Sequence, residues 1–141
     1  MSMPKLTLEL FPETYLVCRM EPSTQAANIW LPMEGFWSLT RSEQEISLVM
    51  AEGNAIPSGA EVEEGWRLLR IAGTLAFSLT GILSQLSTVL ADAGISIFAL
   101  STYDTDYVLV KTHHLAAAMN VLRDAGYAVQ QYTPADSVLL S

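Results

Sequence analysis

The feature of this sequence that most constrains its fold is a short motif that occurs twice. The motif is Val89-Leu-Ala-Asp-Ala-Gly-Ile-Ser-Ile97, and it returns as Val121-Leu-Arg-Asp-Ala-Gly-Tyr-Ala-Val129. Each copy has the residues of a helix end, a glycine that stops the helix, and the start of a buried strand. Apolar residues also recur at helical spacing around each copy, namely Leu79, Ile82, Leu83, Leu86, Val89, Leu90 and Ala93, and then Leu115, Ala118, Met119, Leu122 and Ala125. We therefore expect two helices that each lead into a strand.

Strand patterns complete these two helices into one unit between residues 66 and 132. A strand at Trp66–Ile71 precedes the first helix, a hairpin at 95–111 joins the two helices, and Tyr127–Tyr132 forms the last strand. This order is that of a ferredoxin-like unit, βαββαβ, with both helices on one face of a four-stranded antiparallel sheet. The expected fold class is α+β.

The first half of the chain is expected to form a second, related unit with a shortened first helix. Its expected elements are strands at 5–10 and 15–20 with a turn at Pro12–Thr14, at most two helical turns within 24–30, a hairpin of 35–40 with 45–50, and a linker or long loop at 52–65. At an offset of 61, residues 37–49 match residues 98–110, which sets Glu43 on Asp104 and Glu45 on Asp106. The expected organisation is one unit at 1–60, a complete unit at 61–133 and a tail at 134–141.

Charge argues against two classes of partner. The chain has 15 acidic and 7 basic residues, a net charge of −8, which repels phosphate backbones and anionic membrane surfaces. No apolar run approaches membrane-spanning length, and the single cysteine, Cys18, has no partner for an internal disulfide. We therefore expect a cytoplasmic protein without a nucleic-acid or membrane partner.

The hairpin turn Ser101-Thr-Tyr-Asp-Thr-Asp106 holds more polar groups than a turn requires. Three interpretations stay open. The aspartates can serve the turn by hydrogen bonding their own backbone, they can bind the ammonium or guanidinium group of a ligand, or Asp104-x-Asp106 can hold a divalent metal. A metal site of the nucleotide-dependent kind also needs a phosphate-binding loop, and the sequence has no such motif.

The segment Gly73-Thr-Leu-Ala-Phe-Ser-Leu-Thr-Gly81 leads into the first helix. Free N–H groups and hydroxyls at a helix start can bind a carboxylate or phosphate, and ordinary capping by Ser78 or Thr80 is the alternative. His113 and His114 suit a solvated helix start better than a metal site, because adjacent side chains point to different sides of a helix. No nucleophile stands beside a base in the sequence, so we expect no catalytic residue, no metal ligand and no cofactor.

Three stretches resemble the ACT domains of aspartate kinases: Phe77-Ser-Leu-Thr-Gly-Ile-Leu83, Ala93-Gly-Ile-Ser-Ile-Phe98 and Leu100-Ser-Thr-Tyr-Asp-Thr-Asp-Tyr-Val-Leu-Val110. The chain is most similar to small stand-alone proteins made of two ACT units, and more distantly to the cytosolic arginine sensors of animal cells. The resemblance implies a regulator that binds amino acids at an interface between units and pairs its sheets side by side, within the chain and in a homodimer. The ligand-binding residues that it implies are Phe77, Ser78, Leu79, Thr80, Gly81 and Ile82, with Ser101, Thr102, Asp104 and Asp106 as partners.

The expected function is therefore a non-catalytic regulatory protein that binds a small amino acid. Backbone N–H groups near Ser78–Ile82 would hold the carboxylate, and Asp104 or Asp106 would take the amine or a basic side chain. The acidic balance favours lysine or arginine as the ligand. The first unit lacks an equivalent of Ser78–Gly81, so one full site per chain is expected. The alternative function is an adaptor that pairs with another protein through its sheets and binds no ligand.

Overall fold

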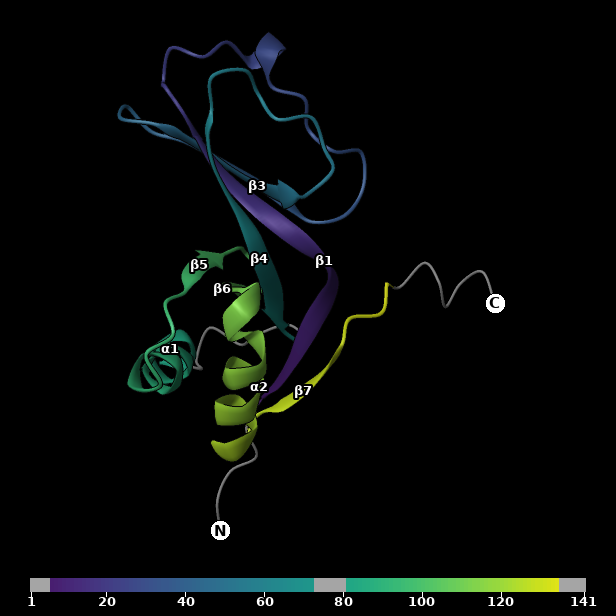
Figure 1. Cartoon of the computed structure of the whole chain (residues 1–141), viewed down its shortest axis with the longest axis vertical. Helices are drawn as coiled ribbons and strands as arrows, with labels where there is room; N and C mark the ends of the chain where they lie inside the picture. Colours follow the sequence, from purple (N-terminus) through teal and green to yellow (C-terminus); the bar gives the residue numbers. More distant parts are fainter. Residues whose placement is uncertain (1–5, 73–80, 135–141) are drawn as a thin grey trace. The chain divides into compact units, whose positions relative to one another are not determined.

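The computed structural model of the chain describes residues 6–72 and 81–134. The chain forms two compact units, a larger one of Met1–Pro12 with Arg67–Ser141 and a smaller one of Glu13–Trp66. The long strands β1 (Thr7–Met20) and β4 (Glu61–Ile71) contribute residues to both units (Figure 1). The two units thus interleave along the chain. The expected division into residues 1–60 and 61–133 cuts the chain at one point and stays a prediction.

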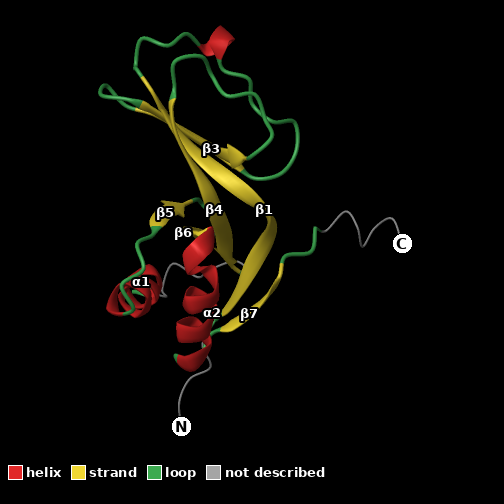
Figure 2. Ribbon diagram, in the orientation of Figure 1, coloured by secondary structure: helices red, strands yellow, loops and turns green. Residues whose placement is uncertain are grey.

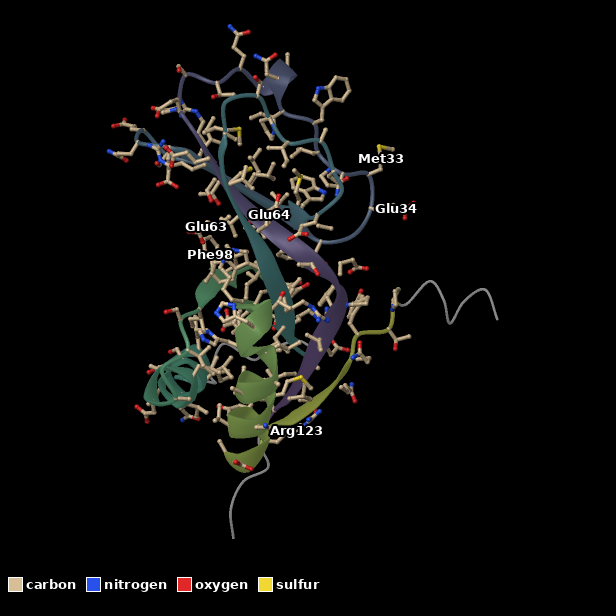
Figure 3. All side chains as sticks on the ribbon, viewed as in Figure 1. Met33, Glu34, Glu63, Glu64, Phe98 and Arg123 are labelled. Carbon is tan, nitrogen blue, oxygen red and sulfur yellow. The ribbon has the colours of Figure 1, made fainter. Side chains whose placement is uncertain are left out.

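The larger unit contains both α-helices of the described chain. After β4 come α1 (Ile82–Asp92), β5 (Phe98–Ser101), β6 (Asp106–Lys111), the 3₁₀ turn η2 (Thr112–His114), α2 (Leu115–Asp124) and β7 (Ala128–Gln131). With the start of β1, its strands follow the order β7-β1-β4-β6-β5. The order β4-α1-β5-β6-α2-β7 is the βαββαβ order that the sequence predicts, and the expected α+β class is confirmed (Figure 2). Figure 3 adds the side chains of the described residues.

One face of this sheet and both helices share a single hydrophobic core. The core joins Leu86 and Leu90 of α1 and Ala118 and Leu122 of α2 to alternate residues of the strands, which are Leu8, Leu10, Leu69, Ile71, Val108 and Val110. Alternate strand residues point to the same face, and helix residues three or four apart share a face. Both helices therefore cover the same face of the sheet, as the sequence predicts.

The last strand departs from the expected four-stranded antiparallel sheet. Thr7–Leu10 of β1 pairs in parallel with Ala128–Gln131 of β7. On its other side β1 meets β4, where the N–H of Ala72 donates to the carbonyl of Thr7 at 2.9 Å. The beginning of the chain thus fills the place next to β4 that the expected topology gives to the last strand. Pairing between segments so far apart in sequence leaves no local signal.

The smaller unit is built on a hairpin and the continuing halves of β1 and β4. Strands β2 (Trp37–Arg41) and β3 (Ile46–Ala51) pair in antiparallel, and β3 also pairs with Tyr15–Met20 of β1. The short turn η1 (Ala26–Asn28) is its only described helical element. The core of this unit is a second cluster of Leu16, Cys18, Met20, Ile46, Leu48 and Met50, against which Ile29, Ala60 and Val62 pack.

Two expectations for the first half of the chain are wrong. No turn occurs at Pro12–Thr14, because β1 runs unbroken from Thr7 to Met20. Pro12 falls between the stretch of β1 that pairs with β7 and the stretch that pairs with β3, so no ladder bond needs its missing N–H. The expected linker at 52–65 is shorter than predicted, since β4 begins at Glu61.

Candidate functional site

The acidic turn lies between β5 and β6 and is closed by its own hydroxyl. Ser101 and Asp106 are paired across the hairpin, and the N–H of Thr102 donates to the carbonyl of Thr105 at 2.8 Å. The Thr102 hydroxyl donates to the same carbonyl at 3.1 Å and accepts the N–H of Thr105 at 3.3 Å. The side chain of Thr102 therefore makes the hydrogen bonds that close the turn, a role that one of the three open interpretations gave to the aspartates.

Thr105 ties this turn to the end of β4. Its side chain is 4% exposed, and its hydroxyl donates to the carbonyl oxygen of Ile71 at 2.8 Å. Ile71 is the last residue of β4, and residues 73–80 lead from there to α1. The acid-bearing turn is therefore fixed at the point where the chain leaves the sheet towards the first helix.

The two aspartates differ in their access to solvent. Asp104 is exposed, and Asp106 is half-buried at the first position of β6. A carboxylate that remains in water at a fixed turn is free to bind an ammonium or guanidinium group by charge-assisted hydrogen bonds. Of the two, Asp104 has the better access to a ligand that arrives from solvent.

The start of α1 is the second part of the candidate site. Gly81 is its N-cap residue with a φ of 76° and makes no side-chain capping hydrogen bond, and the other candidate caps, Ser78 and Thr80, lie outside the described residues. The carbonyl of Gly81 accepts the N–H of Gln85 at 2.8 Å, which closes the first helical turn. Ile82 is half-buried and packs against the core of the larger unit. The N-terminus of α1 thus presents backbone N–H groups and the positive end of the helix dipole, and the N-cap residue Gly81 has no side chain to cap them.

The predicted site residues fall into three groups. Ser101, Thr102, Asp104 and Asp106 lie together in one turn, and Gly81 and Ile82 lie at the start of α1. Phe77, Ser78, Leu79 and Thr80 lie outside the described residues. The turn is hydrogen-bonded to Ile71, the last residue of β4, and α1 begins after residues 73–80 in the sequence. Both parts of the site therefore adjoin the same segment of the chain.

Sequence reasoning missed Thr105. Residue type gives no signal for its role, since Thr102 and Thr105 are both threonines of the same turn. Counting back by twos from the buried Leu109 does place Thr105 on the same face of the strand. This indication of burial is weak, because strand alternation does not have to continue through a turn. The contact with Ile71 joins residues 34 positions apart and is visible only in the fold.

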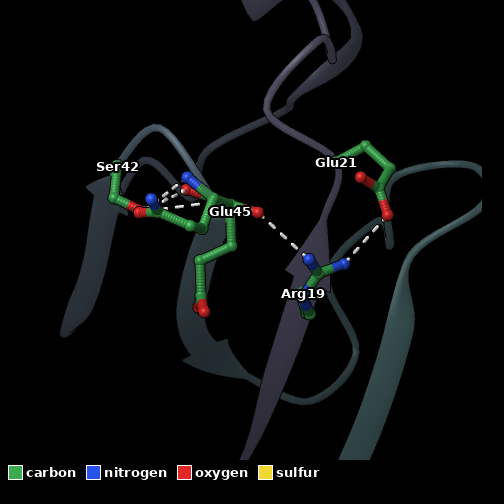
Figure 4. Close-up of polar contacts among 5 residues, drawn as sticks. Arg19, Glu21, Ser42 and Glu45 are labelled. Atoms are coloured by element: carbon green, nitrogen blue, oxygen red, sulfur yellow. Dashed lines mark hydrogen bonds and ion pairs between the residues drawn. The ribbon is translucent and has the colours of Figure 1, made fainter.

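The turn of the smaller unit corrects the expected alignment of the two hairpins. Arg41 pairs with Ile46 as Ser101 pairs with Asp106, so the backbone offset is 60 and the predicted offset of 61 is wrong. Ser42 then takes the place of Thr102, and its hydroxyl likewise bonds the carbonyl three residues on, that of Glu45, at 3.3 Å (Figure 4).

The corrected alignment changes what the two turns share. Gln44 stands at the place of Asp104, and Glu45 stands at the place of Thr105. The hydroxyl that closes the turn is therefore the repeated feature, and Asp104 has no acidic counterpart in the smaller unit. Duplication of the hairpin gives no reason to assign Asp104 a structural role.

An ion pair on the other face of the larger unit's sheet has a structural role. The Arg70 guanidinium donates to Glu9 Oε1 from both Nε, at 2.9 Å, and Nη2, and it lies 5.3 Å from the centroid of the Tyr132 ring. Tyr132 stacks on Phe11 with ring centroids 4.1 Å apart. Burial tends to lower the pKa of Arg70, but the hydrogen bonds and charges of Glu9 and Tyr107 together outweigh it and raise that pKa. These contacts join β4, β1 and the end of β7.

The described residues contain neither a cluster of potential metal-binding side chains nor a membrane-spanning helix. Within residues 6–72 and 81–134, no three or more His, Cys, Asp or Glu side chains gather in a way that could hold a metal ion. His113 and His114 lie in η2, with ring centroids 4.2 Å apart. None of the described helices is long and apolar enough to cross a bilayer.

Comparison with known proteins places this fold in a family. The sequence profile of the ACT domain matches residues 61–124. A crystal structure of a protein from Agrobacterium tumefaciens is 30% identical with a TM-score of 0.79, over 93% of this chain and 97% of that one. The chain belongs to the ACT-domain family.

An arginine sensor resembles this chain in sequence, and two aspartate kinase structures resemble it in fold. The human protein named cytosolic arginine sensor for mTORC1 subunit 1 is 29% identical over 104 residues, which cover 73% of this chain and only 31% of the sensor. The regulatory subunit of aspartate kinase from Thermus thermophilus shares the fold, with a TM-score of 0.62 at 14% identity over 85% of this chain and 97% of that one. Aspartate kinase from Clostridium acetobutylicum has a TM-score of 0.65 at 15% identity, over 89% of this chain and 36% of the kinase.

Proposed function

We propose that this protein is a non-catalytic regulatory protein that binds a free amino acid. One observation carries the proposal: the Thr105 hydroxyl bonds the Ile71 carbonyl at 2.8 Å and so fixes the acid-bearing turn where the chain leaves β4 for α1. A positive helix end and a solvent-exposed carboxylate then flank one segment of the chain. A free amino acid carries the two complementary charges, a carboxylate and an ammonium group.

Backbone N–H groups near Ser78–Ile82 are proposed to hold the ligand's carboxylate. Gly81 supports this role because its own side chain offers no cap to α1, and the helix dipole favours an anion there. Asp104 or Asp106 is proposed to take the amine or a basic side chain, and Asp104 is the more exposed of the two. A hydrogen bond between an ammonium or guanidinium group and a carboxylate is roughly twice as strong as one between neutral groups.

Lysine and arginine are the proposed ligands. The net charge of −8 attracts cations in general, and Asp104 supplies a carboxylate within reach of solvent. The name of one similar protein, the human cytosolic arginine sensor, supports this choice. A cytoplasmic location and a homodimer are parts of the same proposal.

A thermal-shift screen of the twenty amino acids tests the proposal, because a ligand that binds only the native state raises its melting temperature. We expect lysine or arginine to raise the melting temperature at millimolar concentration and leucine to leave it unchanged. The double variant Ser78→Trp with Asp104→Ala should keep its fold and lose the response. If none of the twenty amino acids raises the melting temperature, the proposal fails and the ligand-free adaptor becomes the better account.

A further inference from the structure

Exposed apolar side chains gather in the smaller unit, Glu13–Trp66. Among the large apolar residues that the described chain exposes, only Tyr103 lies outside this unit. The six within it are Trp30, Leu31, Met33, Trp37, Leu39 and Ile56. Single exposed apolar residues are normal on a soluble protein, whereas a group of them on one surface is typical of a contact with another molecule. Such a surface requires that its residues lie on the same side of the unit.

The six residues belong to elements on one side of the unit's sheet. Ile29 follows η1 and Ala60 precedes β4, and both pack against the core cluster of this unit. The two loops that carry four of the six residues are therefore anchored on the core side of the sheet. On β2, Trp37 and Leu39 stand opposite core residues of β3, and opposite residues of an antiparallel pair place their side chains on the same face. All six thus border one face, which we call the loop face.

The segment after η1 is the most exposed part of the loop face. The side chains of Trp30 and Met33 are 72% and 98% exposed, and Figure 3 shows Met33 on the outer side of its loop. The segment is held at its start, where the N–H of Ile29 donates to the carbonyl of Ala26 at 3.1 Å, and Pro32 fixes a backbone angle within it. A surface that is ordered before binding loses less conformational entropy when a partner binds. Tryptophan is also among the residues that most often dominate binding energy, so Trp30 suits the role of an anchor.

The smaller unit also carries almost all of the net charge of the chain. Residues 13–66 contain nine of the fifteen acidic residues and two of the seven basic ones, so the unit has a charge of −7 out of −8. One of its two basic residues, Arg19, already forms an ion pair with Glu21 at 3.0 Å. The larger unit has six acidic and five basic residues and is nearly neutral. The exposed apolar residues and the negative charge of the chain are therefore properties of the same unit.

We propose that the loop face docks a partner protein through a segment that combines basic and apolar side chains. Charge selects the partner, because surfaces of opposite sign attract each other and like charges cost free energy at an interface. A second copy of this chain would bring the same charge of −7 to the face. Nucleic acids and anionic membranes are repelled for the same reason. A basic segment meets the glutamates with its charged side chains, and its apolar side chains cover Trp30 and Met33.

Selection from a displayed library of random peptides, with the full chain as bait, tests the chemistry of the partner without assuming its sequence. We expect the enriched peptides to combine lysine or arginine with leucine, phenylalanine or tryptophan. Synthetic copies of these peptides should bind the chain in fluorescence anisotropy. Their Kd should rise with salt concentration, because dissolved ions screen the attraction between opposite charges.

Two pairs of variants locate the binding surface. Trp30→Ser should raise the Kd of the enriched peptides by at least about tenfold, because it removes the anchor. Its matched control is Tyr103→Ser, which removes an exposed aromatic side chain from the larger unit. Glu34→Lys should raise the Kd more than Asp124→Lys, which makes the same change of charge at an exposed position of the larger unit. All four side chains are exposed, so the variants should fold, and circular dichroism checks this.

Basic and apolar peptides whose affinity falls in both variants of the smaller unit, and not in the two controls, support the proposal. It is overturned if no peptide is enriched, if the enriched peptides lack basic residues, or if their Kd does not change in Trp30→Ser. Equal effects of Glu34→Lys and Asp124→Lys would assign the attraction to net charge and remove the loop face as the surface. If sedimentation velocity shows that Trp30→Ser dissociates a homodimer, a second copy occupies the face instead. The amino-acid site lies in the larger unit, so the thermal-shift screen decides it independently.

Discussion

The hydroxyl of Thr105 donates a hydrogen bond to the carbonyl oxygen of Ile71 at 2.8 Å and so links the β5–β6 turn to the end of β4. The side chain is 4% exposed, so the bond is shielded from water. It is the contact that joins the acidic turn to the chain segment that leads into α1. The proposed site depends on this link, and its strength is directly measurable.

Thr105→Val keeps the shape of the side chain and removes the donor. Leaving a buried acceptor without its partner costs about 1–3 kcal/mol of unfolding free energy. Urea denaturation should show this loss, and Thr105→Ser, which keeps the hydroxyl, should lose less. A larger loss in Thr105→Ser than in Thr105→Val would mean that packing of the methyl group, rather than the hydrogen bond, is what matters at this position.

Glu9→Ala should destabilise the protein by about 1–3 kcal/mol, because it removes the carboxylate that accepts hydrogen bonds from the partly buried Arg70. The matched control is Arg19→Ala in the exposed pair with Glu21, where the loss should be clearly smaller, because water screens an exposed ion pair. Chemical denaturation at low and high salt compares the two. If the two variants lose equal stability, the cluster of Arg70, Glu9 and Tyr132 does not stabilise the larger unit.

Gly81→Ala should cost roughly 1–2 kcal/mol, because a Cβ is disfavoured in the left-handed region. The φ of Gly81 is 76°, and an added Cβ would meet no atom within 4 Å, so the cost comes from the backbone alone. Gly81→Asn should lose less, since asparagine adopts this conformation more readily. Differential scanning calorimetry gives the ranking of glycine, asparagine and alanine, and a different order would contradict the conformation of the helix start.

Stability should fall in alkaline solution. Burial raises the pKa of Cys18 above its ordinary value of 9.0 and that of Tyr127 above its ordinary value of 10.0. Above pH 9.0 the unfolded chain loses these protons before the native chain does, so the native state is favoured less as pH rises. Their contribution is complete below pH 9.0 and is lost as pH rises through the raised values. Urea midpoints measured from pH 8 upward check this, and Tyr127→Phe should flatten the decline above pH 10.0. A decline of unchanged slope in that variant would exclude Tyr127 as a cause.

Asp104→Asn should raise the Kd for lysine and arginine by about tenfold, because a neutral amide replaces the charged acceptor. The matched control is Glu43→Gln, which removes the same charge from the turn of the smaller unit. Calorimetric titration compares the two with the wild-type protein. If both variants lose affinity equally, the attraction comes from net charge rather than from the turn.

Local periodicity predicts much of the larger unit. The helical stripes around Leu86 and Leu122 place α1 and α2 on one core, and glycine stops end both helices. The parallel pairing of Thr7–Leu10 with β7 was not predictable, because it depends on which distant segment lies next to β4, and local residue patterns do not show this. The same holds for Pro12, which is tolerated within β1 only because the partner strand changes there.

The candidate site was predictable in composition and less so in geometry. Polar residue types identified the turn at Ser101–Asp106, but side-chain similarity set the two hairpins one position out of register. Backbone hydrogen bonds fix the register, and these follow Ser42 and Thr102 rather than the acidic residues. Thr105 could not be distinguished from Thr102, since its partner lies on another strand.

The most direct test of the amino-acid site is a nuclear magnetic resonance titration of the ¹⁵N-labelled protein with lysine and arginine. We predict saturable shifts in the amide signals of Gly81, Ile82 and Asp104, with Ser42 in the equivalent turn of the smaller unit unchanged. Leucine should cause no such shifts at the same concentration. Saturable shifts confined to other residues, or none with any of the twenty amino acids, would contradict the account.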